Sequence, residues 1–190
     1  MFCSQLAFGQ TDVDKAGSNQ VRAEVLATGL SNPCGIVVHG DGVFISQSGI
    51  GEVSWFADGI LTPAIVNFET EKYGRSPGFL MGPLGLALSE SGALVVGEGG
   101  QTAGEDRIAS FDLEPNFPAA NWPLNANEPT SQVSLAASKS FAGEGNFYGL
   151  ANSANGILFT CQGDDVKGWI GNAEWNDGCL LYTSPSPRDS

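Results

Sequence analysis

Three stretches of the chain follow the same pattern of glycines and apolar residues. In each, a Gly is followed directly by Ile or Leu, and a second Gly lies seven residues after the first. An apolar run begins right after this second Gly. The copies are Gly35-Ile36 with Gly42, Gly85-Leu86 with Gly92, and Gly149-Leu150 with Gly156. An internal repeat constrains the architecture more than any single residue does. This one predicts an array of small antiparallel sheets.

Each copy has the pattern of strand, tight turn and strand. Asp41-Gly42 and Asn155-Gly156 are typical of hairpin turns, because glycine accepts a positive φ without steric cost. A polar, Gly-rich loop follows the second strand. A third strand then alternates apolar and polar residues, as at 53–56 and 107–111. Alternation with period two predicts a half-buried strand.

The spacing of the copies favours one all-β architecture. The first glycines of the copies are 50 and then 64 residues apart, and a four-stranded propeller blade needs roughly 40 to 50 residues. The longer interval holds the Pro-rich stretch 114–145, where we expect an insertion with one strand near Val133. We therefore predict a partial β-propeller of about three four-stranded antiparallel blades out of an expected six or so, with limits near 21–78, 79–145 and 146–178. Another all-β sandwich or barrel is the alternative.

The repeats also resemble a known family. The segments 32–38, 42–46 and 51–56 resemble one NHL-type blade, and 82–86 with 106–111 resemble it again. The wider superfamily includes the gluconolactonase-like and strictosidine-synthase-like six-bladed propellers. The resemblance implies a fold and says little about activity, because this architecture hosts many functions.

Both ends of the chain look unlike the repeats. Residues 179–190 resemble the translation of a transposase-type sequencing adaptor, so we expect a non-native tail and a natural protein that continues beyond about Gly178. Residues 1–20 are expected to be the remnant of a signal peptide followed by a disordered leader, because Ala7-Phe8-Gly9 fits a cleavage site. A short disordered leader is the alternative. The signal-peptide interpretation predicts a secreted or periplasmic protein.

The net charge of the chain limits the classes of partner that it can bind. The formal net charge is −13, with 15% charged residues, and a field of that sign repels nucleic acid and anionic lipid. No apolar run approaches the roughly 18 residues of a membrane span. We expect a small-molecule or carbohydrate ligand, the remaining blades of a full-length chain as partner, no nucleic acid and no membrane span. Cys34 and Cys161 lie two repeats apart, too far for an expected disulfide, and show no zinc-site spacing.

Topology indicates where a site would lie. In a blade with alternating strands, the second-to-third loops and the crossovers between blades share one end, and the short Gly turns share the other. The loop end carries acidic residues whose convergence predicts a site for Ca²⁺ or another divalent cation, or for sugar hydroxyls. A solvated acidic rim is the alternative. The predicted metal ligands are Glu98, Glu105, Asp106, Asp164 and Asp165, with Glu144 beside them.

No catalytic constellation stands out in the sequence. The single histidine, His39, lies in a hairpin turn, and there is no Gly-x-Ser-x-Gly elbow. The resemblance to lactonase-like propellers implies a metal-binding Asn before the Gly-Leu pair, but Cys34, Leu84 and Tyr148 occupy that position. Four aromatic residues either line a carbohydrate surface or belong to the core: Phe117, Trp122, Trp169 and Trp175.

The functional expectation is therefore a non-catalytic one. We expect a ligand-binding or scaffold module. The first alternative is a metal-dependent hydrolase of sugar lactones or esters, with ligands partly on further blades. The second is a quinone-dependent sugar dehydrogenase. Whether the protein is an enzyme stays open at this point.

Overall fold

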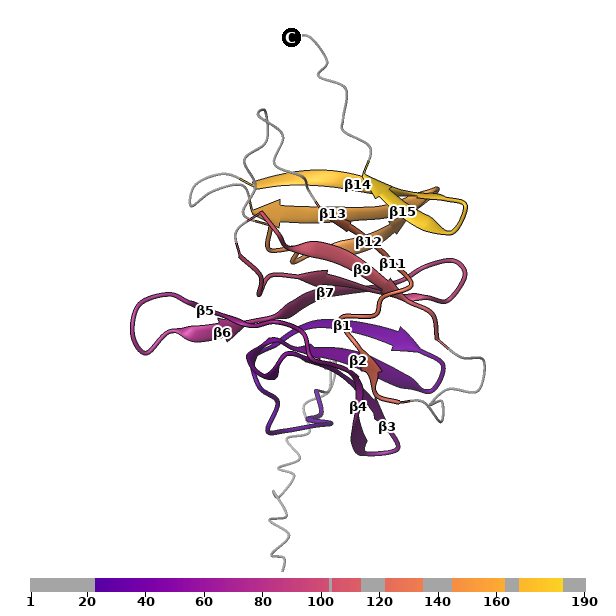
Figure 1. Ribbon diagram of the computed structural model, residues 1–190. Coiled ribbons are helices and arrows are strands. Elements are labelled where there is room, and N and C mark those ends of the chain that lie inside the picture. The colour runs from indigo at the N-terminus through magenta and orange to yellow at the C-terminus, as the bar shows by residue number, and fades with distance from the viewer. Residues whose placement is uncertain (1–22, 103, 114–121, 135–144, 163–167, 183–190) are drawn as a thin grey trace, which may run out of the picture.

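Three antiparallel sheets stacked on one another make up the protein (Figure 1). The computed structural model describes residues 23–102, 104–113, 122–134, 145–162 and 168–182. Within these ranges the only helical element is a three-residue 3₁₀ turn, Ser48–Ile50. The predicted all-β class is confirmed, and each of the three sheets contains four antiparallel strands, to which the first sheet adds a fifth, parallel strand.

Each sheet runs through its strands in sequence order, as a propeller blade does. The first sheet contains β1 (Pro33–His39), β2 (Gly42–Gln47), β3 (Glu52–Ala57) and β4 (Ile60–Val66), with the short β10 (Leu124–Asn125) paired to β4. The second contains β7 (Pro83–Leu88), β8 (Leu94–Glu98), β9 (Arg107–Phe111) and β11 (Ser131–Ser134). The third contains β12 (Leu150–Ser153), β13 (Gly156–Gln162), β14 (Gly168–Asn176) and β15 (Cys179–Tyr182).

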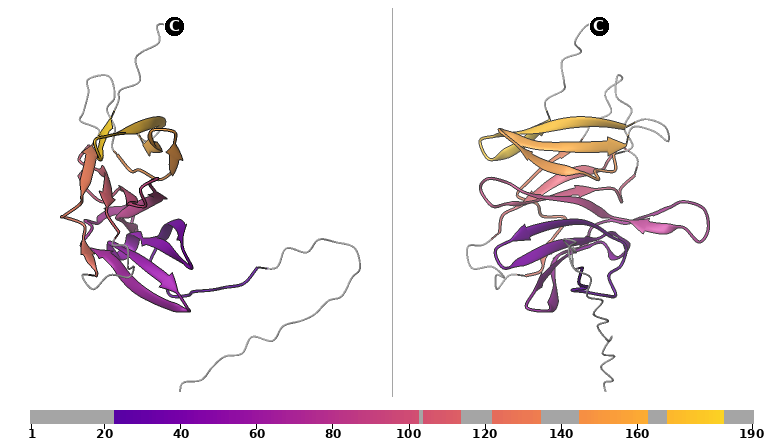
Figure 2. Two further views of the ribbon diagram at one scale, coloured as in Figure 1. Left: turned by 90° about the vertical axis from the view of Figure 1, so that its right-hand side faces the viewer. Right: turned by 180° about the vertical axis from the view of Figure 1, so that it is seen from behind.

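A two-stranded hairpin, β5 (Glu71–Tyr73) and β6 (Phe79–Met81), projects from the stack between the first and second sheets (Figures 1 and 2). It leaves the stack on the side where the second-to-third loops lie. None of the described residues forms a helix long and apolar enough to cross a membrane.

The first glycine of the repeat allows neighbouring sheets to approach closely. A Cβ at Gly35 would lie 2.3 Å from the carbonyl oxygen of Leu84, and a Cβ at Gly85 would lie 2.5 Å from that of Tyr148. Each of these carbonyls belongs to the residue just before the next repeat glycine. Real Cβ atoms do not approach this closely, so the inner strands β1, β7 and β12 can lie side by side only because the repeat has glycine there.

The second glycine of the repeat differs from expectation. The positive φ occurs at Gly92 (87°) but not at Gly42 or Gly156, so the positive-φ explanation is wrong for those two. A Cβ at Gly42 would lie 2.3 Å from the Trp55 ring, and one at Gly156 would overlap the backbone of β14. Close packing, and not turn geometry, selects glycine at these two positions.

Asp-Gly hairpin turns do occur elsewhere, outside the repeat positions. Asp58-Gly59 joins β3 to β4 and Asp177-Gly178 joins β14 to β15, and all four residues have positive φ. Two consecutive positive φ angles are the signature of a type I′ turn, whose twist matches that of paired strands.

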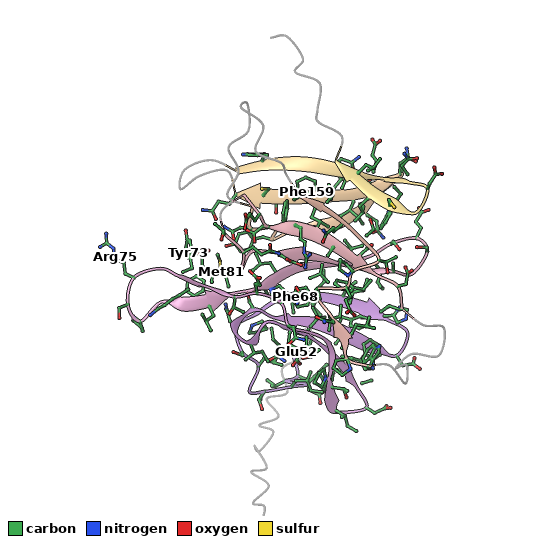
Figure 3. All side chains as sticks on the ribbon, in the orientation of Figure 1. Glu52, Phe68, Tyr73, Arg75, Met81 and Phe159 are labelled. Carbon is green, nitrogen blue, oxygen red and sulfur yellow. The ribbon has the colours of Figure 1, made fainter. Side chains whose placement is uncertain are left out.

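Two hydrophobic clusters fill the spaces between the sheets. Between the first and second sheets lie Phe44, Val53 and Phe111, with Phe68 at their side (Figure 3). Between the second and third lie Val95, Ile108 and Phe159, among others. Each fully buried side chain of this size contributes about 1.5 to 3 kcal/mol. The second sheet belongs to both clusters and is covered on both faces.

Two segments extend the sheets beyond the predicted limits. The expected strand of the 114–145 insertion is β11, and a further strand, β10, pairs parallel with β4 through Leu124 and Ile65. Strand β15 begins at Cys179, one residue past the predicted end of the third blade, and buries Leu180. The adaptor-like residues 179–182 therefore complete the third sheet. Residues 1–22 and 183–190 lie outside the described ranges.

Candidate functional site

The loops and crossovers predicted to share one end of the stack do lie together there. The amide of Gly82 donates to Ser48 Oγ (2.7 Å), and the amide of Gly99 donates to the Gly82 carbonyl (2.9 Å). The amide of Phe147 donates to the Glu98 carbonyl (3.0 Å). These contacts join the loops of the first and second sheets to the crossovers that follow them. We call this region the loop end, and it lies on the side of the projecting hairpin in Figure 1.

Glu98 is almost fully buried at the loop end and forms an ion pair. Its Oε1 lies 2.9 Å from Arg107 Nε, and its Oε2 accepts from the side-chain amide of Gln101. Arg107 also donates to the carbonyl of Ala126 (2.8 Å). Burial raises the pKa of Glu98, against the lowering effect of the Arg107 charge. Both carboxylate oxygens already have partners within the protein.

Asp106 connects the β8–β9 loop to the crossover that leads into the third sheet. Its Oδ1 accepts from the backbone amide of Gln101 (2.9 Å) and its Oδ2 from that of Asn146 (3.0 Å). Burial raises the pKa of Asp106 to about 6, and the two amide hydrogen bonds offset only part of that rise. This carboxylate acts as a structural acceptor for groups 5 and 40 residues away in the sequence.

The structure does not bring the other predicted metal ligands together with Glu98 and Asp106. Glu105 is exposed, while Glu144, Asp164 and Asp165 lie outside the described residues. Within the described ranges, no three His, Cys, Asp or Glu side chains gather closely enough to hold a metal ion. The calcium site stays a prediction.

The base of the projecting hairpin is fastened to the loop end. The Tyr148 hydroxyl donates to Met81 Sδ (3.4 Å), and the side-chain amide of Asn32 donates to the Leu80 carbonyl (3.0 Å). Figure 3 shows Tyr73 and Arg75 further out along the hairpin and Met81 near its base. Burial raises the pKa of Tyr148.

Neither of the two cysteines that lie within the repeats forms a disulfide. Cys34 is exposed and Cys161 is buried, and both are free thiols. The Cys161 thiol donates to the Gly145 carbonyl (2.9 Å), and burial raises its pKa to about 11. A thiol with so high a pKa is a poor nucleophile near neutral pH.

Two adjoining hollows open at the opposite end of the stack, which carries the short turns and which we call the turn end. One has a volume of about 370 Å³ and the other of about 620 Å³, and both are lined by Glu90 and Trp175. The smaller is completed by the β12–β13 turn with Asn152, Asn155 and Glu174. The larger is completed by residues of the second sheet and of the β14–β15 turn: Ser89, Ser91, Ala93, Ser110, Asp112, Thr130, Asp177, Gly178 and Cys179.

The lining of this double hollow suits an uncharged polar ligand. Trp175 is half-buried, and its backbone amide donates to the Asn155 carbonyl (2.9 Å), which joins β14 to the β12–β13 turn. Glu90, Glu174 and the side-chain amide of Asn152 supply hydrogen-bonding groups around it. Neither lining contains Lys or Arg among the described residues. Without a cation, such a site disfavours anions.

The double hollow was not predicted from the sequence, although Trp175 was noted as a residue of either core or carbohydrate surface. Trp175 and Trp169 both pack partly against the second core cluster, and Trp122 packs against the first. Phe117 lies outside the described residues. The signal that was available is the pairing of polar turns with a Trp on the third strand of a neighbouring copy.

Comparison with known proteins does not assign the chain to a family. The sequence matches no protein-family model and no curated protein. The resemblance to NHL-type blades therefore stays a prediction from the sequence repeat.

Proposed function

We propose that the protein is part of an NHL-type β-propeller that acts as a ligand-binding or scaffold module, and that its ligand is a neutral carbohydrate held in the double hollow of the turn end. The observation that supports this most is that Trp175 and Glu90 line both hollows, of which the smaller is mainly polar and the larger mainly apolar. An indole ring offers a flat apolar surface to a sugar ring. The surrounding carboxylates and amides accept and donate hydrogen bonds to its hydroxyls.

The size and charge of the site agree with such a ligand. The two volumes, about 370 and 620 Å³, fall in the range of small-molecule pockets. The net charge of −13 repels anionic ligands. A secreted or periplasmic location, which the cleavage-site pattern Ala7-Phe8-Gly9 favours, is part of the proposal.

The enzymatic alternatives have less support. A metal-dependent lactonase needs carboxylates or amides free to bind a cation, and Glu98 and Asp106 are already used in contacts within the fold. No observation on the described residues specifically favours a quinone-dependent dehydrogenase. Both remain alternatives, and the following experiment distinguishes the lactonase from the binding module.

The test is a titration with neutral oligosaccharides followed by tryptophan fluorescence and calorimetry. We expect binding that Trp175→Ala abolishes and that Glu90→Gln weakens about tenfold, since a hydrogen bond to a charged group contributes about 1.5 to 3 kcal/mol. The matched control is Glu105→Gln, which removes an exposed carboxylate at the other end of the stack and is expected to change nothing.

The opposite results decide against the proposal. Equal binding by Trp175→Ala and by the unaltered protein would place the ligand elsewhere. Tight Ca²⁺ binding together with turnover of a sugar lactone would favour the hydrolase instead.

A further inference from the structure

In the first and second sheets, one face packs against the sheet that follows. The equivalent face of the third sheet is exposed. Register positions make the three sheets comparable. Phe44, Val95 and Leu158 are equivalent, because each lies opposite the residue two after the repeat glycine: Val37, Ala87 and Ala151. Phe44 and Val95 are fully buried, whereas Leu158 is 41% exposed.

The next pair of positions gives the same result. Val53, Ile108 and Ile170 lie opposite Ser46, Gly97 and Thr160 on the neighbouring strand. Val53 and Ile108 are buried, whereas Ile170 is 73% exposed. This exposed side of the third sheet, which we call the open face, carries Ala151, Leu158, Thr160, Ile170 and Leu181 together with the polar Asn172 and Glu174.

The polar contacts of the open face also match those of an occupied one. In the first sheet, Ser46 Oγ accepts from the Gly35 amide (2.6 Å) and donates to the carbonyl of Leu84 in the next sheet (2.6 Å). In the third sheet, Thr160 Oγ1 accepts from the Gly149 amide (2.8 Å). No described residue accepts the proton of the Thr160 hydroxyl.

The repeat glycine shows the same difference. A Cβ at Gly35 or Gly85 would collide with the carbonyl of the residue that precedes the next repeat glycine, while the three atoms nearest to a Cβ at Gly149 all belong to Thr160 of its own sheet. The third copy thus has a glycine for the close approach of a neighbouring inner strand and, like the first copy, a hydroxyl for its carbonyl, and no strand of the described residues lies against them.

A partly exposed surface of the same kind lies on the outward face of the first sheet, where Ile45 and Ser54 are already buried but the residues of β1 are not. In β1, Ile36 occupies the register position that Leu86 occupies in β7, opposite Ile45 and Val96 respectively. Leu86 is 6% exposed where it meets the first sheet, but Ile36 is 65% exposed and Val38 is 68% exposed. The carbonyl of Cys34 precedes Gly35 as that of Leu84 precedes Gly85.

We propose that the open face is a docking surface for another sheet of this repeat, and that in the 190-residue chain its occupant is the first sheet of a second copy, joined head to tail. Gly149 of one copy then lies under the Cys34 carbonyl of the other, and the Thr160 hydroxyl donates to that carbonyl. Because the surfaces at the two ends differ, the contact is heterologous. Two copies joined at both ends would close a ring of six sheets.

The test is the mass of the chain in solution, measured by light scattering during gel filtration. We expect the unaltered protein at twice the monomer mass of 19.7 kDa. Ile170→Asp on the open face and Ile36→Asp on the first sheet should each give a monomer. Both side chains are exposed, so neither substitution is expected to prevent folding, and circular dichroism checks that each variant keeps its sheets.

Mixing the two variants makes the test specific. The intact open face of Ile36→Asp fits the intact first sheet of Ile170→Asp, so an equimolar mixture should restore a dimer through one contact. The control is Phe79→Asp, which replaces another exposed apolar residue on the projecting hairpin and should leave the dimer intact.

Three results would overturn the proposal. The first is an unaltered protein that stays monomeric at its highest soluble concentration. The second is a dimer that survives in Ile36→Asp alone, because two open faces would then be in contact with each other. The third is a dimer lost in Phe79→Asp with circular dichroism unchanged, which would place the contact on the hairpin.

Discussion

The second and third sheets are built from the same repeat, yet one is covered on both faces and the other on one face. Both have four antiparallel strands in sequence order, and both place apolar side chains on each face. Ile108 and Ile170 are the same residue type at equivalent positions and differ from 1% to 73% exposed. The repeat therefore encodes a surface for contact between sheets, and its burial depends on the position in the stack.

The second sheet also forms polar contacts with its neighbours at the loop end. The second sheet is fastened there by the Glu98–Arg107 ion pair and by the two hydrogen bonds of Asp106. Asp106 reaches Asn146, just before the third sheet begins. The second sheet thus supplies polar as well as apolar contacts to its neighbours, so changes in it should cost more than equivalent changes in the third sheet.

The largest expected effect comes from the isoleucine pair. Ile108→Ala should lower the free energy of unfolding by about 3 kcal/mol, because it removes buried methyl and methylene groups and leaves a cavity. Ile170→Ala should change it by less than about 0.5 kcal/mol in dilute protein, because the side chain is already in water. Urea unfolding followed by circular dichroism measures both values.

Equal losses for the two isoleucines would break the comparison between the sheets. A large loss for Ile170→Ala that disappears on dilution would instead identify the stabilisation as that of a dimer, since the contribution of a partner depends on protein concentration.

The repeat glycines give a second, smaller contrast. Gly85→Ala should destabilise the protein by about 2 kcal/mol, because a Cβ there collides with a backbone carbonyl that cannot turn aside. Gly149→Ala should cost less than about 1 kcal/mol in dilute protein, where no second copy lies against it, since the atom it meets, 2.9 Å away, is the end of the Thr160 side chain. The same urea titration checks both variants, and a greater loss at Gly149 would contradict the packing explanation of the repeat.

The sequence was sufficient to predict the sheets but not all of their strands. The apolar runs and alternation located β1, β2, β3, β7, β8, β9 and β13. The fourth strand of the first sheet was not recognised, although Asp58-Gly59 is a hairpin signal, because Pro63 interrupts the strand that follows. Pro63 is tolerated near the outer edge of the sheet, where only the two-residue β10 lies beyond β4.

The candidate site was predicted in part. Strand alternation was enough to place Glu98 and Asp106 at the same end. It could not show that their oxygens are occupied, because the partner of Asp106 at Asn146 is 40 residues away. The hollow at the turn end was missed because short turns were expected to close that end. Its shape depends on how neighbouring sheets are offset, which is a property of the packing between them.

The smallest expected effect concerns the pH dependence that Asp106 contributes. Burial raises the pKa of this carboxyl from an ordinary value of 3.8 to about 6, so the folded protein binds its proton more tightly than the unfolded chain does. The stability contributed by Asp106 is therefore fully present below pH 3.8 and is lost as the pH rises through about 6. Carbon-13 NMR of the side-chain carboxyl should show a titration midpoint near 6.

Asp106→Asn isolates this contribution, because the amide does not titrate. Between pH 4 and pH 6, the free energy of unfolding of the unaltered protein should fall relative to that of the variant, and above pH 6 the difference should be constant. At every pH the variant has one side-chain oxygen for the amides of Gln101 and Asn146, which should cost about 1 kcal/mol. Glu105→Gln serves as the control, since Glu105 is exposed beside it. A parallel pH profile for Asp106→Asn and the unaltered protein would mean that the pKa of Asp106 is not raised on folding, because its two amide hydrogen bonds then offset the effect of burial in full.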